Sequence, residues 1–459
     1  MLSEPTVARV LKAALSRGGD FAEVYCEAST GTRILLEDGR LEDVVCGQDA
    51  GVGLRLVREG REVYGYSNDF SETALLEVAR FLAGAANGAA GRQRFSFKKK
   101  RGAPMQRVLK KPARISLDEK VSYLERGNAR ARSVPDIRQV TVSLRDNEGD
   151  VLIANSEGLW AEDHRTYLTY SVHVVAERGD TVETGYEPVG GTLGYEILEG
   201  EQVEHVARVA ADRARMLLRA PKARGGPMTV VLSSSAGGTM IHEAVGHGLE
   251  ADLAQEELSV YADKLGERIA SPLVTVIDDA TLGGKRGSYR FDDEGVPGQR
   301  TVLVENGILK RFMESRITAG KDGARPTGNG RRESYEHLPI VRMSNTMIAP
   351  GSDDPGDIIS SVHRGLLVTQ MGGGQVNTVN GDFVFEVSEG FIIERGQIGH
   401  AVRGATLTGN GPKILMEIDR VGSDLGFGIG TCGKEGQGVP VADAQPTIRI
   451  PEIVVGGQH

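Results

Sequence analysis

The sequence predicts an α+β fold, with N-terminal α/β units followed by a large, mostly antiparallel β C-terminal domain. That domain carries one helix with two histidines and a glutamate, the candidate metal-site helix. Three observations support this prediction. Helical spacing of apolar residues is confined to a few segments, and short β runs fill the chain between them. The 61 glycines follow no Gly-X-Y repeat and therefore indicate many turns. At 459 residues the chain has room for two or three domains.

The first predicted unit covers residues 1–91 and has a helix near each end. Ser3 followed by Pro5 is typical of a helix start, and Gly18-Gly19 ends that helix. Between residues 22 and 66 the sequence predicts short β runs broken by turns, with hairpins at residues 37–39 and 59–60. A second helix is expected from about residue 71 to residue 86.

Residues 92–114 form a basic segment that contains ten lysines and arginines and no acid. Phe95 and Phe97 lie within it, a combination that also occurs in nucleic-acid-binding segments. The net charge of −9 opposes binding of a polyanion, and charge runs are most often solvated linkers. We therefore interpret the segment as a connector and do not expect nucleic acid as a partner.

The second unit, residues 115–222, repeats the order helix, strands, helix. Ser116 and Glu119 form a capping box at its first helix, strands follow from residue 140 to 187, and a helix is expected over residues 203–218. Gly225-Gly226-Pro227 marks the start of the C-terminal domain, residues 223–459, which is almost wholly strand and turn after one helix.

That helix contains the segment His242-Glu243-Ala244-Val245-Gly246-His247. Imidazoles are favoured zinc ligands, and a glutamate beside the first can take a proton from the attacking water, as in the shorter HExxH peptidase motif. Histidines five residues apart lie about 140° apart on a regular α-helix, too far for one ion. A single π-turn would bring them together, so we predict a bulged helix around residues 242–247.

A catalytic zinc needs a third protein ligand. Glu250 and Asp252 lie close by in sequence, and Cys432 lies in a glycine-rich segment near the C-terminus. All three could serve, and residue chemistry alone leaves the choice open. Buried core histidines remain the alternative interpretation of the whole motif.

The sequence resembles the TldD/PmbA family, specifically its zinc-bearing TldD branch. The resemblance rests on HEAVGHGLEAD (242–252), GNGRRESYEHLPIVRMSNT (328–346), GHAVRGATLTGNGP (399–412) and GTCGKEGQGVPV (430–441). It implies metal ligands His242, His247 and Cys432, with Glu243 as the catalytic base. It also implies a zinc peptidase that acts on short or unfolded peptides, and a homodimer or a heterodimer with a PmbA-like paralogue.

Several expectations complete this interpretation. Cys26 and Cys46 are expected to be buried thiols, and three sparse cysteines favour the cytoplasm. Neither a signal peptide nor a membrane span is expected. The segment GRRESYEHLP offers possible stabilisers of a developing oxyanion, although a satisfied surface turn is the favoured alternative; they are Arg331, Arg332, Tyr335 and His337. The alternative function is a non-catalytic peptide- or protein-binding regulator linked to gyrase or nucleic acid.

Overall fold

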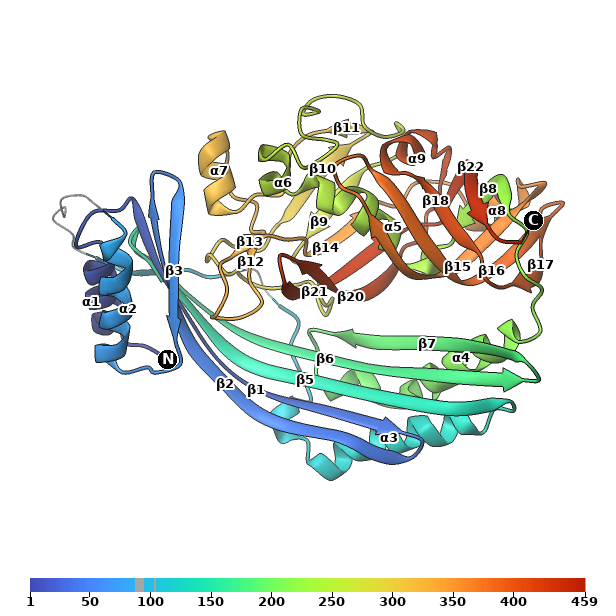
Figure 1. Cartoon of the computed structure of the whole chain (residues 1–459), viewed down its shortest axis with the longest axis horizontal. Helices are drawn as coiled ribbons and strands as arrows, with labels where there is room; N and C mark the ends of the chain where they lie inside the picture. The colour runs from blue at the N-terminus through green and yellow to red at the C-terminus, as the bar shows by residue number, and fades with distance from the viewer. Residues whose placement is uncertain (87–94, 103–104, 459) are drawn as a thin grey trace.

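The computed structural model describes residues 1–86, 95–102 and 105–458, and its N-terminal half is built on one long curved sheet. The strand order is β3-β2-β1-β5-β6-β4, with β7 also paired to β6 (Figure 1). The strands are β1 (Phe21–Glu37), β2 (Arg40–Arg58), β3 (Arg61–Ser67), β4 (Lys98–Lys99), β5 (Ile137–Asn155), β6 (Leu159–Arg178) and β7 (Thr181–Gly191).

Four helices cover one face of this sheet. Helices α1 (Glu4–Ala14) and α2 (Glu72–Gly84) pack at one end, and α3 (Leu117–Arg132) and α4 (Gln202–Leu217) at the other. Val24 and Ile34 of β1 contribute to these two cores, and their even spacing places them on the same face. Tyr25 points to the opposite face, where it packs with Phe291 and Tyr335 of the C-terminal half.

The strands are longer than the sequence predicts. We expected short runs broken by turns between residues 22 and 66, but β1 and β2 are continuous over 17 and 19 residues. A Cβ on Gly53 would lie 1.9 Å from the Tyr64 hydroxyl, and one on Gly51 would lie 2.3 Å from the Tyr335 ring. These glycines permit close packing rather than turns. The predicted hairpin turns are confirmed, because Asp38-Gly39 and Glu59-Gly60 all have positive φ.

The two predicted N-terminal units share this sheet. Strand β1 pairs antiparallel with β5 from Glu23–Asn155 to Glu37–Thr141. In the described part of the basic segment, β4 pairs with β6, and the backbone amides of Leu109 and Lys110 donate to Glu196. Residues 92–94 and 103–104 of that segment lie outside the described residues.

The C-terminal half contains two larger sheets and one two-stranded ribbon. A six-stranded sheet has the order β11-β10-β9-β14-β21-β20. A seven-stranded sheet has the order β15-β8-β22-β18-β16-β17, with β19 also paired to β22. A β15–β16 pairing closes five of its strands into a ring. Most pairings are antiparallel, as predicted, but β14–β21 and β8–β15 are parallel.

The bounds of these strands are as follows: β8 (Gly226–Leu232), β9 (Val276–Asp279), β10 (Arg300–Glu305), β11 (Ile308–Leu309), β12 (Gly330–Arg331), β13 (Ile340–Val341), β14 (Asn345–Ile348), β15 (Arg364–Val376), β16 (Asp382–Glu394), β17 (Gln397–Val402), β18 (Thr406–Asn410), β19 (Arg420–Val421), β20 (Gly426–Lys434), β21 (Gln437–Gln445) and β22 (Ile448–Gly456). The helices are short: α5 (Thr239–Ile241), α6 (Ala251–Gln255), α7 (Arg316–Asp322), α8 (Pro355–Ser360) and α9 (Gly411–Glu417).

The segment that carries the histidine motif is part of the largest hydrophobic core. Ile241 and Val245 pack there with Leu232 of β8 and Val439 of β21, which belong to different sheets. The motif is thus held from both sides by rigid strands. Among the described residues, no helix is long and apolar enough to cross a membrane.

Candidate metal centre and the cavity beside it

The histidine motif adopts the bulged helix that its spacing predicts. Residues 242–246 form a π-helical turn, and the backbone N–H of His247 donates to the carbonyl of His242, five residues earlier. A Cβ at Gly246 would lie 2.1 Å from the sulfur of Met343, so a larger residue at this turn would displace that side chain. The prediction of a π-turn is therefore confirmed.

The turn brings both histidines next to Cys432 of β20. One ligand atom from each of the three residues lies within 4.8 Å of the others, and all three residues are buried. The Cys432 Sγ lies 3.5 Å from His247 Nε2. Two such ligands of a tetrahedral zinc ion would be about 3.6 Å apart, given Zn–S and Zn–N bonds of about 2.3 and 2.05 Å. The arrangement therefore fits zinc.

A buried carboxylate fixes the orientation of His247. Glu250 Oε2 lies 3.0 Å from His247 Nδ1, which leaves Nε2 to face Cys432. Lys434 lies between the two acids, with Nζ 3.1 Å from Glu250 and 2.7 Å from Asp252. The two acids that sequence chemistry offered as third ligands are thus engaged by His247 and Lys434. Neither joins the cluster of ligand atoms in the described chain.

The three side chains carry complementary charges. Burial disfavours the Cys432 thiolate, but hydrogen bonds with the two histidines outweigh it and lower its pKa to about 5. Burial lowers the pKa of His247, but the Glu250 carboxylate has the opposite effect, and the net result is a pKa well above the usual value. Nδ1 of His242 is buried and has no hydrogen-bond partner among the described residues. Buried polar atoms are rarely left without a partner, and a bound metal ion would supply one.

Glu243 faces a cavity of about 780 Å³ that His242 also lines. Burial raises the pKa of Glu243, and the positive charges of His242 and His247 only partly offset this. The cavity lies between the two halves of the molecule, with walls from β7 and from the C-terminal strands β15 and β20. A volume of this size can hold several residues of a peptide.

The other predicted residues lie elsewhere. Arg331, Arg332, Tyr335 and His337 do not line the cavity of Glu243, and Arg331 donates instead to the carbonyls of Met343 and Pro440. The contacts of Arg331 therefore agree with the alternative of a satisfied network.

The two remaining cysteines differ from each other. Cys26 is buried as predicted, but the prediction for Cys46 is wrong, because it is exposed. Cys46 lies in the part of β2 beyond the end of β3, which pairs only with Val52–Arg58, so no strand covers its outer edge.

Sequence reasoning missed the structural role of Lys434. The only available signal was its position two residues after Cys432, which on a strand places both side chains on the same face.

Comparison with family models gives three matches that together span most of the chain. They are described as PmbA/TldA metallopeptidase domain 1 over residues 22–86, the central domain over residues 110–218 and the C-terminal domain over residues 225–457.

Curated proteins with similar sequences are metalloproteases. A "Metalloprotease TldD homolog" from Haemophilus influenzae is 36% identical over 100% of this chain and 97% of its own length. A "Metalloprotease" from Methanothermobacter thermautotrophicus is 37% identical over 95% of this chain and 96% of its own length. A "Zinc metalloprotease TldD homolog" from Saccharolobus solfataricus is 29% identical over 74% of this chain and 76% of its own length.

Two crystal structures share the fold over nearly the full length. One, from Thermotoga maritima and described as a candidate modulator of a DNA gyrase, has a TM-score of 0.82 at 23% identity and covers 99% of this chain and 100% of that chain. The other, TldE from Thermococcus kodakarensis, has a TM-score of 0.75 at 18% identity and covers 98% of this chain and 100% of that chain.

Proposed function

This chain belongs to the PmbA/TldD metallopeptidase family, and we propose that it is a zinc-dependent peptidase that hydrolyses short or unfolded peptides. The observation that carries the proposal is the convergence of His242, His247 and Cys432 beside the Glu243 carboxylate. Zinc bound by these three residues would supply Lewis acidity and would make a water molecule more acidic.

Glu243 is the proposed general base. It takes a proton from the attacking water and then passes it to the leaving amine. The raised pKa of its carboxyl group supports this role, because a base that titrates nearer to neutral pH can also serve as the acid in the second step. Glu250 keeps His247 in one tautomer and orientation throughout.

The walls of the cavity support an extended peptide as substrate. Strands β7 and β20 each lie at the edge of a sheet and both line the cavity. Edge strands offer unpaired backbone groups, which bind extended chains with little regard to side chains. Gly372 and Gly373 of β15 also line it, so that backbone can approach backbone there. A folded protein would not present its chain in this form.

We also propose that the protein forms a dimer, with itself or with a PmbA-like paralogue; the family resemblance supports this. Sedimentation of the purified chain, alone and with such a paralogue, distinguishes the two forms. The cytoplasmic location expected from the cysteines likewise stays a prediction.

The function is tested by cleavage of an unstructured peptide and of a folded domain that contains the same sequence. We expect cleavage of the free peptide alone, its loss in chelator and its return when zinc is added back. Glu243→Gln should retain zinc and lose cleavage, because the base is removed while the ligands remain. No cleavage by the zinc-loaded chain, with or without a PmbA-like paralogue, would remove the peptidase proposal and favour a binding role.

A further inference from the structure

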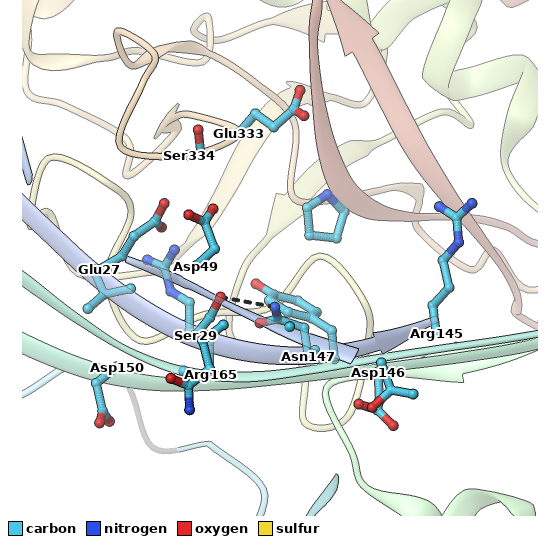
Figure 2. Close-up of a pocket in the computed structure, with 18 of the residues that line it drawn as sticks. Glu27, Ser29, Asp49, Arg145, Asp146, Asn147, Asp150, Arg165, Glu333 and Ser334 are labelled. Carbon is cyan, nitrogen blue, oxygen red and sulfur yellow. Dashed lines mark hydrogen bonds between the residues drawn. The ribbon is translucent and has the colours of Figure 1, made fainter. Parts of the chain in front are cut away.

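Arg286 lies where two cavities meet. One is the cavity of Glu243, about 780 Å³ in volume. The other, of about 610 Å³, lies between the concave face of the N-terminal sheet and the C-terminal half (Figure 2). Arg286 lines both of them. Its loop follows β9 and touches the N-terminal half where Thr192 donates to the carbonyl of Lys285.

The guanidinium of Arg286 has spare hydrogen-bonding capacity. Its Nε donates to the carbonyl of Gly430 at 3.1 Å, and its Nη2 lies 3.5 Å from the hydroxyl of Thr431. An arginine carries five N–H donors, so most of them remain available. In the described chain no carboxylate lies within ion-pair distance of Arg286. Burial lowers the pKa of Arg286, because desolvation disfavours its positive charge.

Two further cations lie beside it. Lys285 lines the Glu243 cavity with its Nζ 3.8 Å from the centre of the Phe427 ring, and burial alone lowers its pKa. Arg145 rises from the sheet toward the C-terminal half in the second cavity (Figure 2). The charges of Arg331 and then Arg145 lower the pKa of Arg286 further, while Tyr167 and Tyr186 act in the opposite direction. Neither Lys285 nor Arg145 has a carboxylate at ion-pair distance among the described residues. We call Arg145, Lys285 and Arg286 the cationic cluster.

Buried arginines of this protein are compensated in two ways. Arg331 and Arg342 donate to backbone carbonyls, and others pair with acids. Arg55 pairs with Glu23 and Glu294, and Arg165 pairs with Asp293. Lys285 and Arg286 are partly buried, whereas Arg145 is exposed. A partly buried cation without an acid is costly unless a ligand completes it. The cationic cluster is therefore arranged for an anion.

The anion would lie within a few residues of the reacting peptide bond. Gly430, which accepts from Arg286, lies two residues from Cys432 on β20, a separation of about 7 Å along the strand. An extended peptide advances about 3.3 Å per residue, so this distance corresponds to about two residues of substrate. A carboxylate is the anion that a peptide itself carries, and arginine binds it with two parallel hydrogen bonds.

We propose that the cationic cluster binds a carboxylate of the peptide substrate, with Arg286 as the principal contact, and so favours peptides that carry a carboxylate about two residues from the cleaved bond. This proposal rests on the peptidase function proposed above. The carboxylate comes from the peptide C-terminus or from an aspartate or glutamate side chain. Arg286 is a specificity residue in either case, because it acts on binding and not on the bond that breaks.

Binding and cleavage of a set of matched peptides test the proposal. The fluorescent peptides share one parent sequence. One pair differs only in having a free C-terminal carboxylate or a C-terminal amide. The other pairs differ in having glutamate or glutamine at each internal position in turn. Their dissociation constants are measured on the full-length protein in chelator, so that no peptide is cleaved. The variants are Arg286→Gln, Lys285→Gln and Arg286→Lys. Arg138→Gln is the matched control, because Arg138 is 68% exposed and pairs with Glu177, away from both cavities.

We expect the wild type to bind one class of carboxylate peptide about tenfold more tightly than its neutral counterpart, as one charge-assisted contact gives. Preference for the free C-terminus identifies the terminal carboxylate, and preference for internal glutamate identifies a side chain. Arg286→Gln should weaken binding of the carboxylate peptide far more than binding of the neutral peptide and so abolish the preference. Lys285→Gln should reduce the preference, Arg286→Lys should keep part of it, and Arg138→Gln should retain it in full.

Equal binding of charged and neutral peptides by the wild type would overturn the proposal. So would equal weakening of both by Arg286→Gln, which would show a structural role for this residue. Cleavage of the neutral peptide by the zinc-loaded wild type is measured in parallel. If that peptide is cleaved, the peptidase function stands whatever the binding preference is.

Discussion

Replacement of Glu250 by glutamine should weaken zinc binding without unfolding the protein. The Glu250 side chain is fully buried, and its Oε2 lies 3.0 Å from His247 Nδ1. Glutamine keeps the shape but removes the charge that orients and polarises this imidazole. Loss of such a carboxylate typically lowers metal affinity about 10- to 100-fold. That loss equals about 1.4 to 2.7 kcal/mol of binding free energy. A charge-assisted hydrogen bond is worth a similar amount.

The assay is competition for zinc with a chelator of known affinity, and Asp252→Asn is the matched control. Asp252 and Glu250 both form ion pairs with Lys434, and the Asp252 carboxylate lies 2.7 Å from Lys434 Nζ. Asp252 does not contact His247. Both variants disturb the same buried charge network, and we expect only Glu250→Gln to lower zinc affinity tenfold or more. Zinc affinity of Glu250→Gln within about twofold of the wild type would refute this reasoning, since a tenfold loss is the smallest typical effect. An equal loss in Asp252→Asn would show that general destabilisation is responsible.

Three further predictions concern packing and buried charge. Gly246→Ala should lower the free energy of unfolding by about 1–3 kcal/mol and also reduce zinc affinity, because its Cβ would lie 2.1 Å from the Met343 sulfur and would disturb the π-turn. Urea denaturation measures the first effect and chelator competition the second. An unchanged free energy of unfolding and an unchanged zinc affinity would contradict this prediction. Gly51→Ala should destabilise the protein by a similar amount, about 1–3 kcal/mol, because its Cβ would lie 2.3 Å from the Tyr335 ring where the N-terminal sheet meets the C-terminal half. Urea denaturation measures this, and an unchanged free energy of unfolding would contradict the prediction. Burial raises the pKa of Glu314 to about 7 from a usual value of 4.5, so the carboxyl favours the folded state increasingly as pH falls from above 7 toward 4.5. Glu314→Gln should therefore be more stable than the wild type at pH 8, where the wild-type carboxylate is charged, and the gain should shrink at pH 5; urea titrations at both pH values that show the same difference would argue against the raised pKa.

The local geometry of the metal motif could be predicted from sequence because only one arrangement satisfied it. His242 and His247 are five residues apart, and a shared ion then requires a π-turn, which the structure has. The third residue of the cluster could not be derived in this way. Cys432 lies 185 residues from His247 in sequence, and the pairings of β20 with β21 and of β21 with β14 place it in the sheet beside the motif. Only the resemblance to a family pointed to it in advance.

The N-terminal sheet shows a different limit of sequence reasoning. Gly51 and Gly53 lie within β2, but glycine occurs both in turns and where another side chain packs closely, and the sequence alone does not separate the two cases. The contacts that decide it come from Tyr64 and from Tyr335, which is nearly 300 residues away in sequence. The positions of Lys285 and Arg286 likewise depend on how the two halves pack. No local pattern marks them.

X-ray absorption at the zinc edge of the full-length protein tests the central claim most directly. We predict one zinc ion per chain with one sulfur ligand at about 2.3 Å and two imidazole nitrogens at about 2.0–2.1 Å. The sulfur contribution should disappear in Cys432→Ser. A wild-type spectrum without sulfur, or a chain that retains no zinc after equilibration with the metal, would contradict the assignment of His242, His247 and Cys432 as the ligands.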